Sequence, residues 1–269
     1  MKMKWYGTAA LMIFDRQTGI AFDPFFGIRQ GERNPGNISF KDVGMTVLAS
    51  EVFVTHGHFD HIIQIPAVFS RGRTTIHATA TPCATLKQHG VPERQLDVIS
   101  PGWSGCFGDI RMTAWQGRHC VFDAPLVVRT ALRYLKPRNF RHGLRLLRYN
   151  RQYPENGEIL FYELECRGRR LQIMGSMGLA PEVDYPTGAD LLILPYQGKS
   201  DPLEYAASLV ERLRPKAVLL DHYDDSFPPM TARVDTAAFE KYITQKHNIP
   251  CRAMERGVTY DIEELTTFI

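Results

Sequence analysis

Apolar and polar positions along the chain predict many short strands interspersed with helices. Residues 3–23 alternate apolar side chains with turn residues at Gly7 and at 15–19, and therefore predict successive strands that end at Asp23. Pro24 follows, and a proline cannot continue the hydrogen-bonded ladder. Short apolar runs predict further strands over 52–54, 75–78, 96–99, 110–115, 159–166, 171–174, 190–194, 217–220, 251–254 and 258–262.

Between these strands, apolar residues at helical spacing predict helices. Two of them begin with a capping residue, Thr81 and Asp201, followed by a proline in the first turn. A short helix or turn is predicted over 62–69 and a helix over 235–246. The glycine- and asparagine-containing stretch 27–44 predicts a loop that forms one wall of a substrate cleft. Periodicity alone thus indicates a mixed α/β protein.

Three histidines and one carboxylate lie within six positions, directly after the apolar run 52–54. On an extended chain, side chains two residues apart project to one side, so His56 and His58 can bind one ion. Asp60 and His61 follow where the chain turns toward a helix, which aims them at a second point nearby. Imidazole and carboxylate ligands suit Zn, Mn or Fe. The alternative, a polar turn without metal, leaves four ligand-type side chains with no cation to neutralise and coordinate them.

The His-x-His-x-Asp-His pattern resembles the signature of the metallo-β-lactamase-fold hydrolases. Other members of that signature match in order and context: Asp23 at a strand end, His119 after a strand, and His222 after the strand predicted at 217–220. The resemblance spans about residues 1–265 and implies a four-layer αββα sandwich. The opening residues 4–8 and the later 221–223 resemble, within this family, the branch of ascorbate-phosphate lactonases and phospholipase-D-type phosphodiesterases.

The resemblance implies a catalytic centre with two divalent ions, Zn or Mn. One ion would be held by His56, His58 and His119, and the other by Asp60, His61 and His222. Three protein ligands per ion leave room for water, and a bound cation lowers the pKa of that water to about 7. Asp60 is expected to orient the attacking water and accept its proton.

Asp23 and Asp221 are expected to orient the metal ligands without binding the ions themselves. The alternative for Asp23 is a simple turn-forming carboxylate. Asp224 and Asp225 are candidates for partners of the His222 ring, or else part of a solvated turn.

The family's bridging carboxylate is missing, because Gly175 is followed by Ser176 where most members have Gly-Asp. Without it, a site with two ions is more electropositive, or else only one ion is retained. Both outcomes favour an anionic substrate, which we expect to be an ester, phosphodiester or lactone of a small molecule or lipid. Substrate contacts are predicted at Arg133, Arg145, Tyr196 and Lys199.

Length and composition are compatible with a single domain over residues 1–269, since 44% of the 269 residues are hydrophobic. The five cysteines are widely spaced and never form a Cys-x-x-Cys pair, which argues against a disulfide framework and a thiolate zinc site. The apolar stretch after the first four residues is short and interrupted, so no signal or membrane helix is indicated and we expect a cytoplasmic protein.

Residues 124–157 form a basic helical insertion in this prediction. Eight Lys and Arg residues stand against the single acid Glu155, a net charge of +7 in a chain whose total is +3. The insertion could be a solvated face whose arginines cover apolar surface, a cap that attracts an anionic substrate, or a face that contacts a partner or acidic lipid headgroups at a membrane. Nucleic acid is disfavoured because no nucleic-acid-binding module accompanies the charge. A homo-oligomer stays one alternative.

These features favour a metal-dependent hydrolase. The competing hypotheses are a non-catalytic metal- or anion-binding protein of the same fold, and a nuclease if the basic segment projects as a separate arm.

Overall fold

The computed structural model describes residues 1–15, 18–25, 27 and 49–267. The loop predicted at 27–44 lies outside this part of the chain, apart from Gly27.

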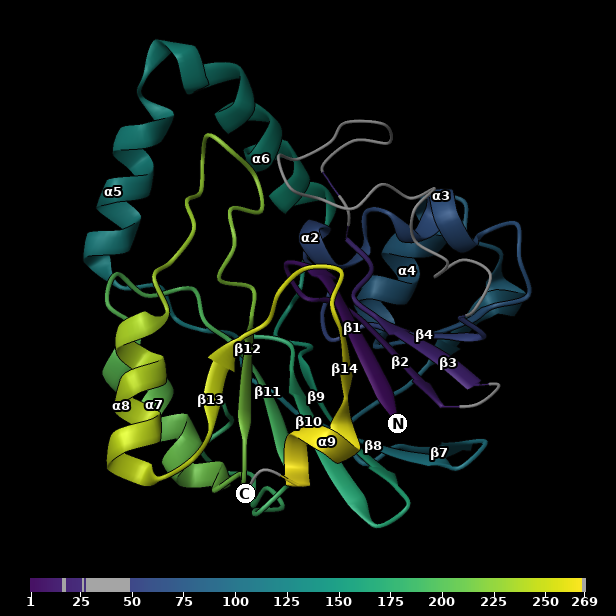
Figure 1. The fold of residues 1–269 in the computed structure, drawn as a ribbon. Coiled ribbons are helices and arrows are strands. Elements are labelled where there is room, and N and C mark those ends of the chain that lie inside the picture. The colour runs from purple at the N-terminus through teal and green to yellow at the C-terminus, as the bar shows by residue number, and fades with distance from the viewer. Residues whose placement is uncertain (16–17, 26, 28–48, 268–269) are drawn as a thin grey trace.

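Two seven-stranded sheets form the centre of the molecule (Figure 1). The first sheet has the order β14-β1-β2-β3-β4-β5-β6 and the second the order β13-β12-β11-β10-β9-β8-β7. The strands of the first are β1 (Lys2–Gly7), β2 (Ala10–Asp15), β3 (Thr18–Phe22), β4 (Glu51–Phe53), β5 (Thr75–Ala78), β6 (Leu96–Val98) and β14 (Thr259–Asp261). Those of the second are β7 (Ser104–Phe107), β8 (Ile110–Gln116), β9 (Leu160–Cys166), β10 (Arg169–Met174), β11 (Leu191–Pro195), β12 (Val218–Asp221) and β13 (Cys251–Ala253).

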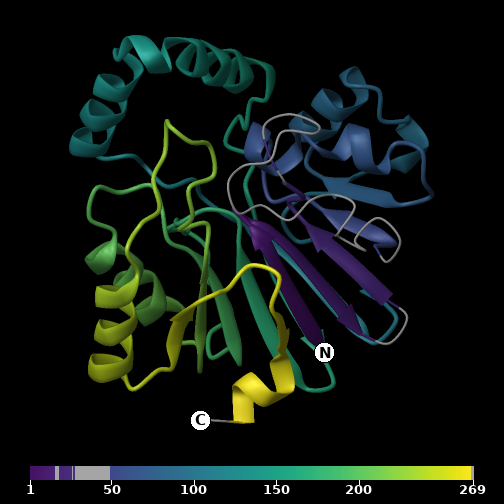
Figure 2. The same ribbon diagram turned by 45° about the horizontal axis from the view of Figure 1, so that its top comes forward.

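Helices cover the outer faces of both sheets, as Figures 1 and 2 show. The first sheet carries α2 (Phe59–Ile62), α3 (Ile65–Phe69) and α4 (Ala80–Gln88), and the second carries α7 (Leu203–Leu213) and α8 (Ala237–His247). The remaining helices are η2 (Glu93–Gln95), α5 (Ala124–Tyr134), η3 (Pro137–Asn139), α6 (Phe140–Gln152) and α9 (Ile262–Thr267). The expected four-layer αββα sandwich is therefore confirmed. Among the described residues, no helix is both long enough and apolar enough to cross a membrane.

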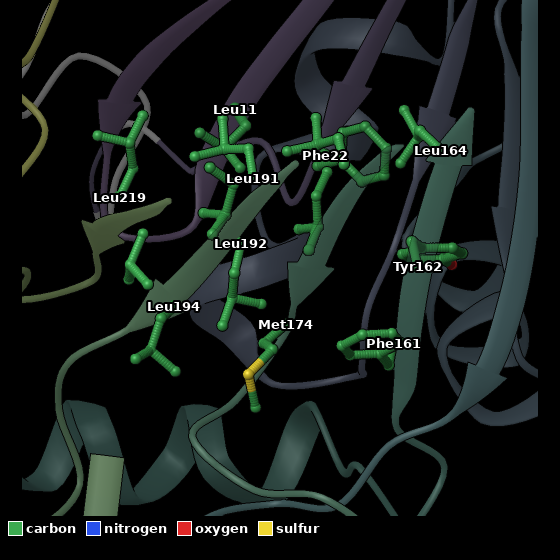
Figure 3. Packing of buried hydrophobic residues seen from close by; sticks show 14 of the residues in the cluster. Leu11, Phe22, Phe161, Tyr162, Leu164, Met174, Leu191, Leu192, Leu194 and Leu219 are labelled. Atoms are coloured by element: carbon green, nitrogen blue, oxygen red, sulfur yellow. The ribbon is translucent and has the colours of Figure 1, made fainter. Parts of the chain in front are cut away.

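The core lies where the two sheets face each other (Figure 3). Phe22 of the first sheet and Tyr162 of the second meet edge to face, with ring centroids 5.6 Å apart. The Tyr162 hydroxyl donates a hydrogen bond of 2.7 Å to the Val54 carbonyl. Val54 directly precedes residues 55–58, which we call the histidine-rich loop. One edge of this loop is thus fixed from the opposite sheet.

Some element boundaries differ from the predicted ones. The helix expected to be capped by Thr81 begins earlier, with Thr79 in the cap position. Thr81 lies in the first turn, where its backbone N–H and its hydroxyl both donate to the Glu158 carboxylate. The helix expected over 62–69 is divided into α2 and α3, and Pro66 lies in the first turn of α3, where a proline is tolerated. Strand β7 and helix α9 were not predicted.

The parallel strands determine where the site forms. Strands β3, β4, β5 and β6 are parallel neighbours in one sheet, and β10, β11, β12 and β13 are parallel neighbours in the other. The carboxyl ends of parallel strands lie at one edge of a sheet, where loops collect functional residues. Asp23 follows β3, Thr55 follows β4 and His222 follows β12, so all three lie at such an edge.

Candidate metal centre

Six ligand-type side chains form two neighbouring groups in the described part of the chain. One group contains His56, His58 and His119, and the other contains Asp60, His61 and His222. Within each group the potential ligand atoms lie within 4.8 Å of one another. The sequence analysis had assigned the same six residues to the same two groups.

The first group consists of three neutral imidazoles. His56 Nε2 lies 3.0 Å from His58 Nδ1, which is close to the roughly 3.3 Å separating two nitrogen ligands about 2.0 Å from one tetrahedral zinc ion. The His119 ring lies edge-on to both, with centroid distances of 5.3 Å and 4.7 Å. Burial lowers the pKa of all three rings, that of His58 to about 4. Their lone pairs are consequently available to a cation at neutral pH.

The second group is built around a carboxylate. Asp60 Oδ2 lies 3.4 Å from His222 Nε2 and 4.0 Å from His61 Nε2. Burial by itself would raise the pKa of Asp60, but His61 and His222 lower it below its usual range, so the carboxylate is ionised. Burial likewise opposes the charged form of His222, yet the hydrogen bond that its ring donates to the Asp60 carboxylate raises the His222 pKa to about 9. A cation in this group would replace the His222 proton, because metal ligation requires the neutral ring.

Asp23 holds the histidine-rich loop in place, as expected. Its carboxylate accepts hydrogen bonds from the backbone N–H of Thr55 at 2.8 Å and from the Thr55 hydroxyl at 2.6 Å. Oδ2 also lies 2.8 Å from His61 Nδ1, which leaves Nε2 of that ring for a cation. Asp23 adopts a positive φ of 42°, an uncommon conformation for a residue other than glycine. The conformation turns the chain at the end of β3 so that the carboxylate points back at the loop.

His222 is positioned by residues that the sequence analysis did not identify. Its φ is +53°, and its backbone N–H donates to the Thr8 carbonyl at 3.0 Å. Ring atom Nδ1 lies 2.8 Å from Gln197 Oε1, so Nδ1–H donates to the amide and Nε2 faces Asp60. Gln197 follows β11, which pairs with β12 in parallel through Pro195 and Asp221. One sequence signal could have suggested Gln197: it is a polar residue just after β11, the strand that lies next to β12, which ends before His222.

Asp221 makes no hydrogen bond to the His222 ring, and its expected support of the ligands stays a prediction. The ring partner is Gln197, and the buried Oδ1 of Asp221 has no hydrogen-bond partner among the described residues. Burial raises the pKa of the Asp221 carboxyl well above its usual range. Asp224, which was left open, accepts from the backbone N–H of Thr8 at 3.1 and 3.0 Å and pairs with Arg256, so it fixes the Thr8 turn instead of the ring.

Ser176 lies between the two loops that carry the first group. A Cβ on Gly175 would come within 2.1 Å of Thr55 Cβ, so the chain here is pressed against the histidine-rich loop. The Ser176 hydroxyl accepts a hydrogen bond of 3.0 Å from the backbone N–H of Cys120, the residue after His119. The position is therefore adjacent to the ligands, and its expected orientation toward two metal ions stays a prediction.

The four residues predicted to bind substrate have different surroundings. Tyr196 is a correction: its side chain is buried in the main core against Phe239 of α8, so it is not placed for substrate contact. Lys199 donates to the Val121 carbonyl at 2.5 Å, and Arg133 donates to the Met230 carbonyl at 3.0 Å. For these two, and for the half-buried Arg145 on α6, a substrate contact stays a prediction.

The donor set fits divalent metal ions. It comprises five imidazoles and one carboxylate, the ligand types that zinc and related transition metals take in proteins. The ring centroids of His56 and His61, one residue from each group, are 3.9 Å apart, so the two groups are in direct contact. Outer partners orient His61 through Asp23, His119 through the Cys120 carbonyl and His222 through Gln197. Ligands with such partners are held ready for a metal ion.

Comparison with known proteins agrees with this geometry. A protein of Sinorhizobium medicae named as a metal-dependent hydrolase is 30% identical over 115 residues, which are 42% of this chain and 43% of that protein, so the match spans less than half of the relative. Igni18, described as a novel metallo hydrolase from Ignicoccus hospitalis, shares the fold with a TM-score of 0.65 at 20% identity, covering 97% of this chain and 98% of that one.

An isothiocyanate hydrolase from Delia radicum gut bacteria has a TM-score of 0.60 at 14% identity, covering 97% of this chain and 98% of that one. Residues 18–223 match the family model described as a beta-lactamase superfamily domain, which is more than half of the chain. The matched segment includes all six ligand residues and their partners Asp23 and Gln197. The resemblance to the metallo-β-lactamase-fold hydrolases is confirmed at the level of the superfamily, and the chain belongs to the β-lactamase superfamily.

Proposed function

We propose that this protein is a metal-dependent hydrolase with two divalent ions, Zn or Mn, that acts on an anionic ester, either a phosphodiester or a phosphorylated lactone. The observation that carries the proposal is the pair of adjacent three-residue ligand groups, each with its donor atoms within 4.8 Å. The relative from S. medicae, named as a metal-dependent hydrolase, supports the reaction class. A cytoplasmic location stays a prediction from the sequence.

Different residues of the chain have different roles in the proposed hydrolysis. A bound divalent cation supplies Lewis-acid chemistry, because it lowers the pKa of water and takes up negative charge that forms on the attacked group. Asp60 is the ionised, buried carboxylate of the second group, and we assign its Oδ2 to accept the proton of the attacking water. Asp23 and Gln197 keep the rings of His61 and His222 in the orientation that this geometry needs.

The charge of the site favours an anionic substrate. Asp60 is the single carboxylate among the six donors, and Ser176 replaces the bridging carboxylate of other family members. Two divalent cations would therefore keep most of their positive charge, which stabilises a negatively charged transition state. The same reasoning favours a phosphate- or carboxylate-bearing ester over a neutral β-lactam.

Metal analysis of the protein purified without chelator tests this proposal. We expect up to two Zn or Mn ions per chain, one for each ligand group, and hydrolysis of a model phosphodiester or a phosphorylated lactone. His58→Ala should remove the ion of the first group and the activity together, because the side chain lies on a loop and contributes no core packing.

The matched control is His89→Ala, since His89 is an exposed histidine that belongs to neither ligand group. It should retain metal and activity. Full activity in metal-replete His58→Ala would disprove the site assignment. Metal binding with no turnover on any anionic ester would favour the alternative, a non-catalytic metal-binding protein.

A further inference from the structure

Exposed apolar side chains are concentrated on one short segment. Of the eleven large hydrophobic side chains that are at least 40% exposed in the described residues, nine lie between Val121 and Leu147. They are Val121, Phe122, Val127, Val128, Leu132, Leu135, Phe140, Leu144 and Leu147, which we call the apolar patch. Single exposed apolar residues are normal on a protein surface, but a cluster of this kind marks an interaction site.

The apolar patch is carried mainly by an arch of two helices. Figures 1 and 2 show that α5 and α6 are joined into an arch. The arch lies over the end of the sandwich that carries the loops following the parallel strands. None of the residues of α5 is buried, and α6 buries only Gly143 and Leu146. An open hollow of about 890 Å³ lies along α5, and its lining alternates apolar residues such as Val128 and Leu132 with cationic ones such as Arg129.

The arch is held in position by specific contacts, so its exposed face is preformed. The Asp123 carboxylate caps α5 by accepting from the backbone N–H of Leu126, and it also accepts from the backbone N–H and hydroxyl of Ser200. Arg133 donates to the Met230 carbonyl. At the other end, the Tyr149 ring of α6 lies 5.6 Å from Phe59 of α2. The side chains of the patch themselves stay exposed.

The segment that carries the patch is also strongly basic. Six of the eight Lys and Arg residues of segment 124–157 are exposed, namely Arg129, Lys136, Arg138, Arg141, Arg148 and Arg151. Apolar side chains interleaved with cations on a helix are the pattern of interfacial segments, which insert apolar groups below lipid headgroups and bind the phosphates with Lys and Arg.

We propose that the α5–α6 arch docks on a membrane surface that contains anionic phospholipids. A second copy of the chain is disfavoured as occupant because it would bring a +7 segment against another +7 segment. Nucleic acid would satisfy the cations, and its bases could stack on the Phe122 and Phe140 rings, but it would leave the seven Val and Leu side chains of the patch without a partner. An acidic bilayer satisfies both features of the surface.

Docking through this arch places the metal centre close to the bilayer. Phe122, a member of the apolar patch, has its ring 5.7 Å from His119, a ligand of the first group. The patch therefore begins one side chain away from the ligands. The inference goes beyond the proposed hydrolysis and does not depend on it, because membrane binding is measured without substrate.

Co-sedimentation of the full chain with vesicles tests the proposal. We expect binding to vesicles of phosphatidylcholine with phosphatidylglycerol at least about tenfold stronger than binding to phosphatidylcholine alone, and weaker binding at high salt. Leu135→Ser with Leu144→Ser, and separately Arg138→Glu with Arg148→Glu, should each lower binding by about tenfold or more, because all four side chains are exposed on the arch. The matched control, Val98→Ser with Arg111→Glu, changes an exposed apolar and an exposed basic residue elsewhere and should bind as wild type.

A second variant reports insertion directly. Leu132→Trp should show a blue-shifted fluorescence on anionic vesicles, because Leu132 lies on the patch. Equal binding to neutral and anionic vesicles, no binding to either, or an unchanged affinity of the Leu135→Ser, Leu144→Ser variant would overturn the proposal. A dimer in light scattering that this variant converts to a monomer, without vesicle binding by wild type, would assign the patch to self-association. Tight nucleic-acid binding without vesicle binding would also overturn it.

Discussion

At the scale of single residues, the metal centre depends on partners that lie behind the ligands. His61 and His222 both use Nδ1 to contact a neighbour, Asp23 in one case and Gln197 in the other, so that Nε2 faces Asp60. One partner is a charged carboxylate and the other a neutral amide. The two imidazoles of the second group are therefore electronically different, since a carboxylate makes the ring it contacts more basic.

Ser176→Asp tests whether position 176 faces the metal ions. If it does, the new carboxylate should bridge them, tighten the second ion and bring occupancy close to two per chain. We expect slower turnover of a phosphodiester despite better metal retention, because the added negative charge opposes an anionic transition state. Calorimetric titration of metal measures affinity and stoichiometry.

Ser176→Asn is the control for this variant, since it has the shape of the aspartate without its charge. If Ser176→Asp and wild type bind metal with the same stoichiometry and affinity, the side chain does not face the ions. Its role would then be limited to accepting the Cys120 amide.

Ligand residues were the most predictable part of the site, and their supports the least. Three histidines and an aspartate in six positions constitute a distinctive pattern, whereas Gln197 is an ordinary polar residue in a loop and only the pairing of β11 with β12 brings it to His222. Tyr196 was predicted to contact substrate. Its side chain packs into the core instead, and the sequence does not specify which way a residue after a strand end points.

At the scale of elements, the segment after α6 covers the histidine-rich loop. An added Cβ on Gly57 would lie 2.3 Å from the Pro154 carbonyl oxygen and 3.5 Å from Glu155 Cα. The absence of a side chain between two ligand histidines is therefore a packing requirement. The segment after α6 lies directly on the loop that carries His56 and His58.

Gly57→Ala should push these two segments apart. The clash is with backbone, so relief requires a main-chain shift, with a cost of about 1–3 kcal/mol in the free energy of unfolding and weaker binding of the first metal ion. Chemical unfolding and metal titration measure the two effects. Gly72→Ala is the matched control because its Cβ would meet the Phe69 carbonyl at an ordinary 3.5 Å. Unchanged metal affinity in Gly57→Ala would show that the covering segment does not fix the ligands.

Most elements could be predicted from periodicity, and the differences have local causes. Thr81 followed by Pro82 indicates a helix start, but Thr81 instead bonds Glu158 from inside the first turn of α4, a contact between residues 77 positions apart. Strand β7 (Ser104–Phe107) is short and only partly buried, so it shows no apolar alternation of its own and forms because it pairs with β8. The layered arrangement itself required the family resemblance, since mixed α/β patterns fit several folds.

At the scale of the whole molecule, the metal centre joins the two sheets. Each ligand group takes two residues from the segment after β4 of the first sheet, either His56 and His58 of the loop or Asp60 and His61 of α2. The third residue of each group comes from the second sheet, His119 after β8 or His222 after β12. Bound ions would thus connect halves of the sandwich that otherwise meet through side-chain packing.

Removal of metal should therefore lower the stability of the entire fold. A ligand that binds only the folded state stabilises it by about 4 kcal/mol at a thousandfold excess over its Kd, so chelation should lower Tm by several degrees and added Zn or Mn should restore it. Differential scanning calorimetry with and without chelator measures the shift. In the double variant His58→Ala, Asp60→Asn the shift should disappear. A Tm that is insensitive to metal in wild type would contradict the bridging role.

Because α5 buries none of its side chains and α6 only two residues, the arch adds little to the interior of the protein. Its outward positions are thus free of the packing constraints that restrict the sheets. Substitutions on the arch can change what the protein docks on, while the sandwich and its six ligand residues stay the same. The surface on which the protein docks can therefore vary through the arch, while the metal ligands of the sandwich remain unchanged.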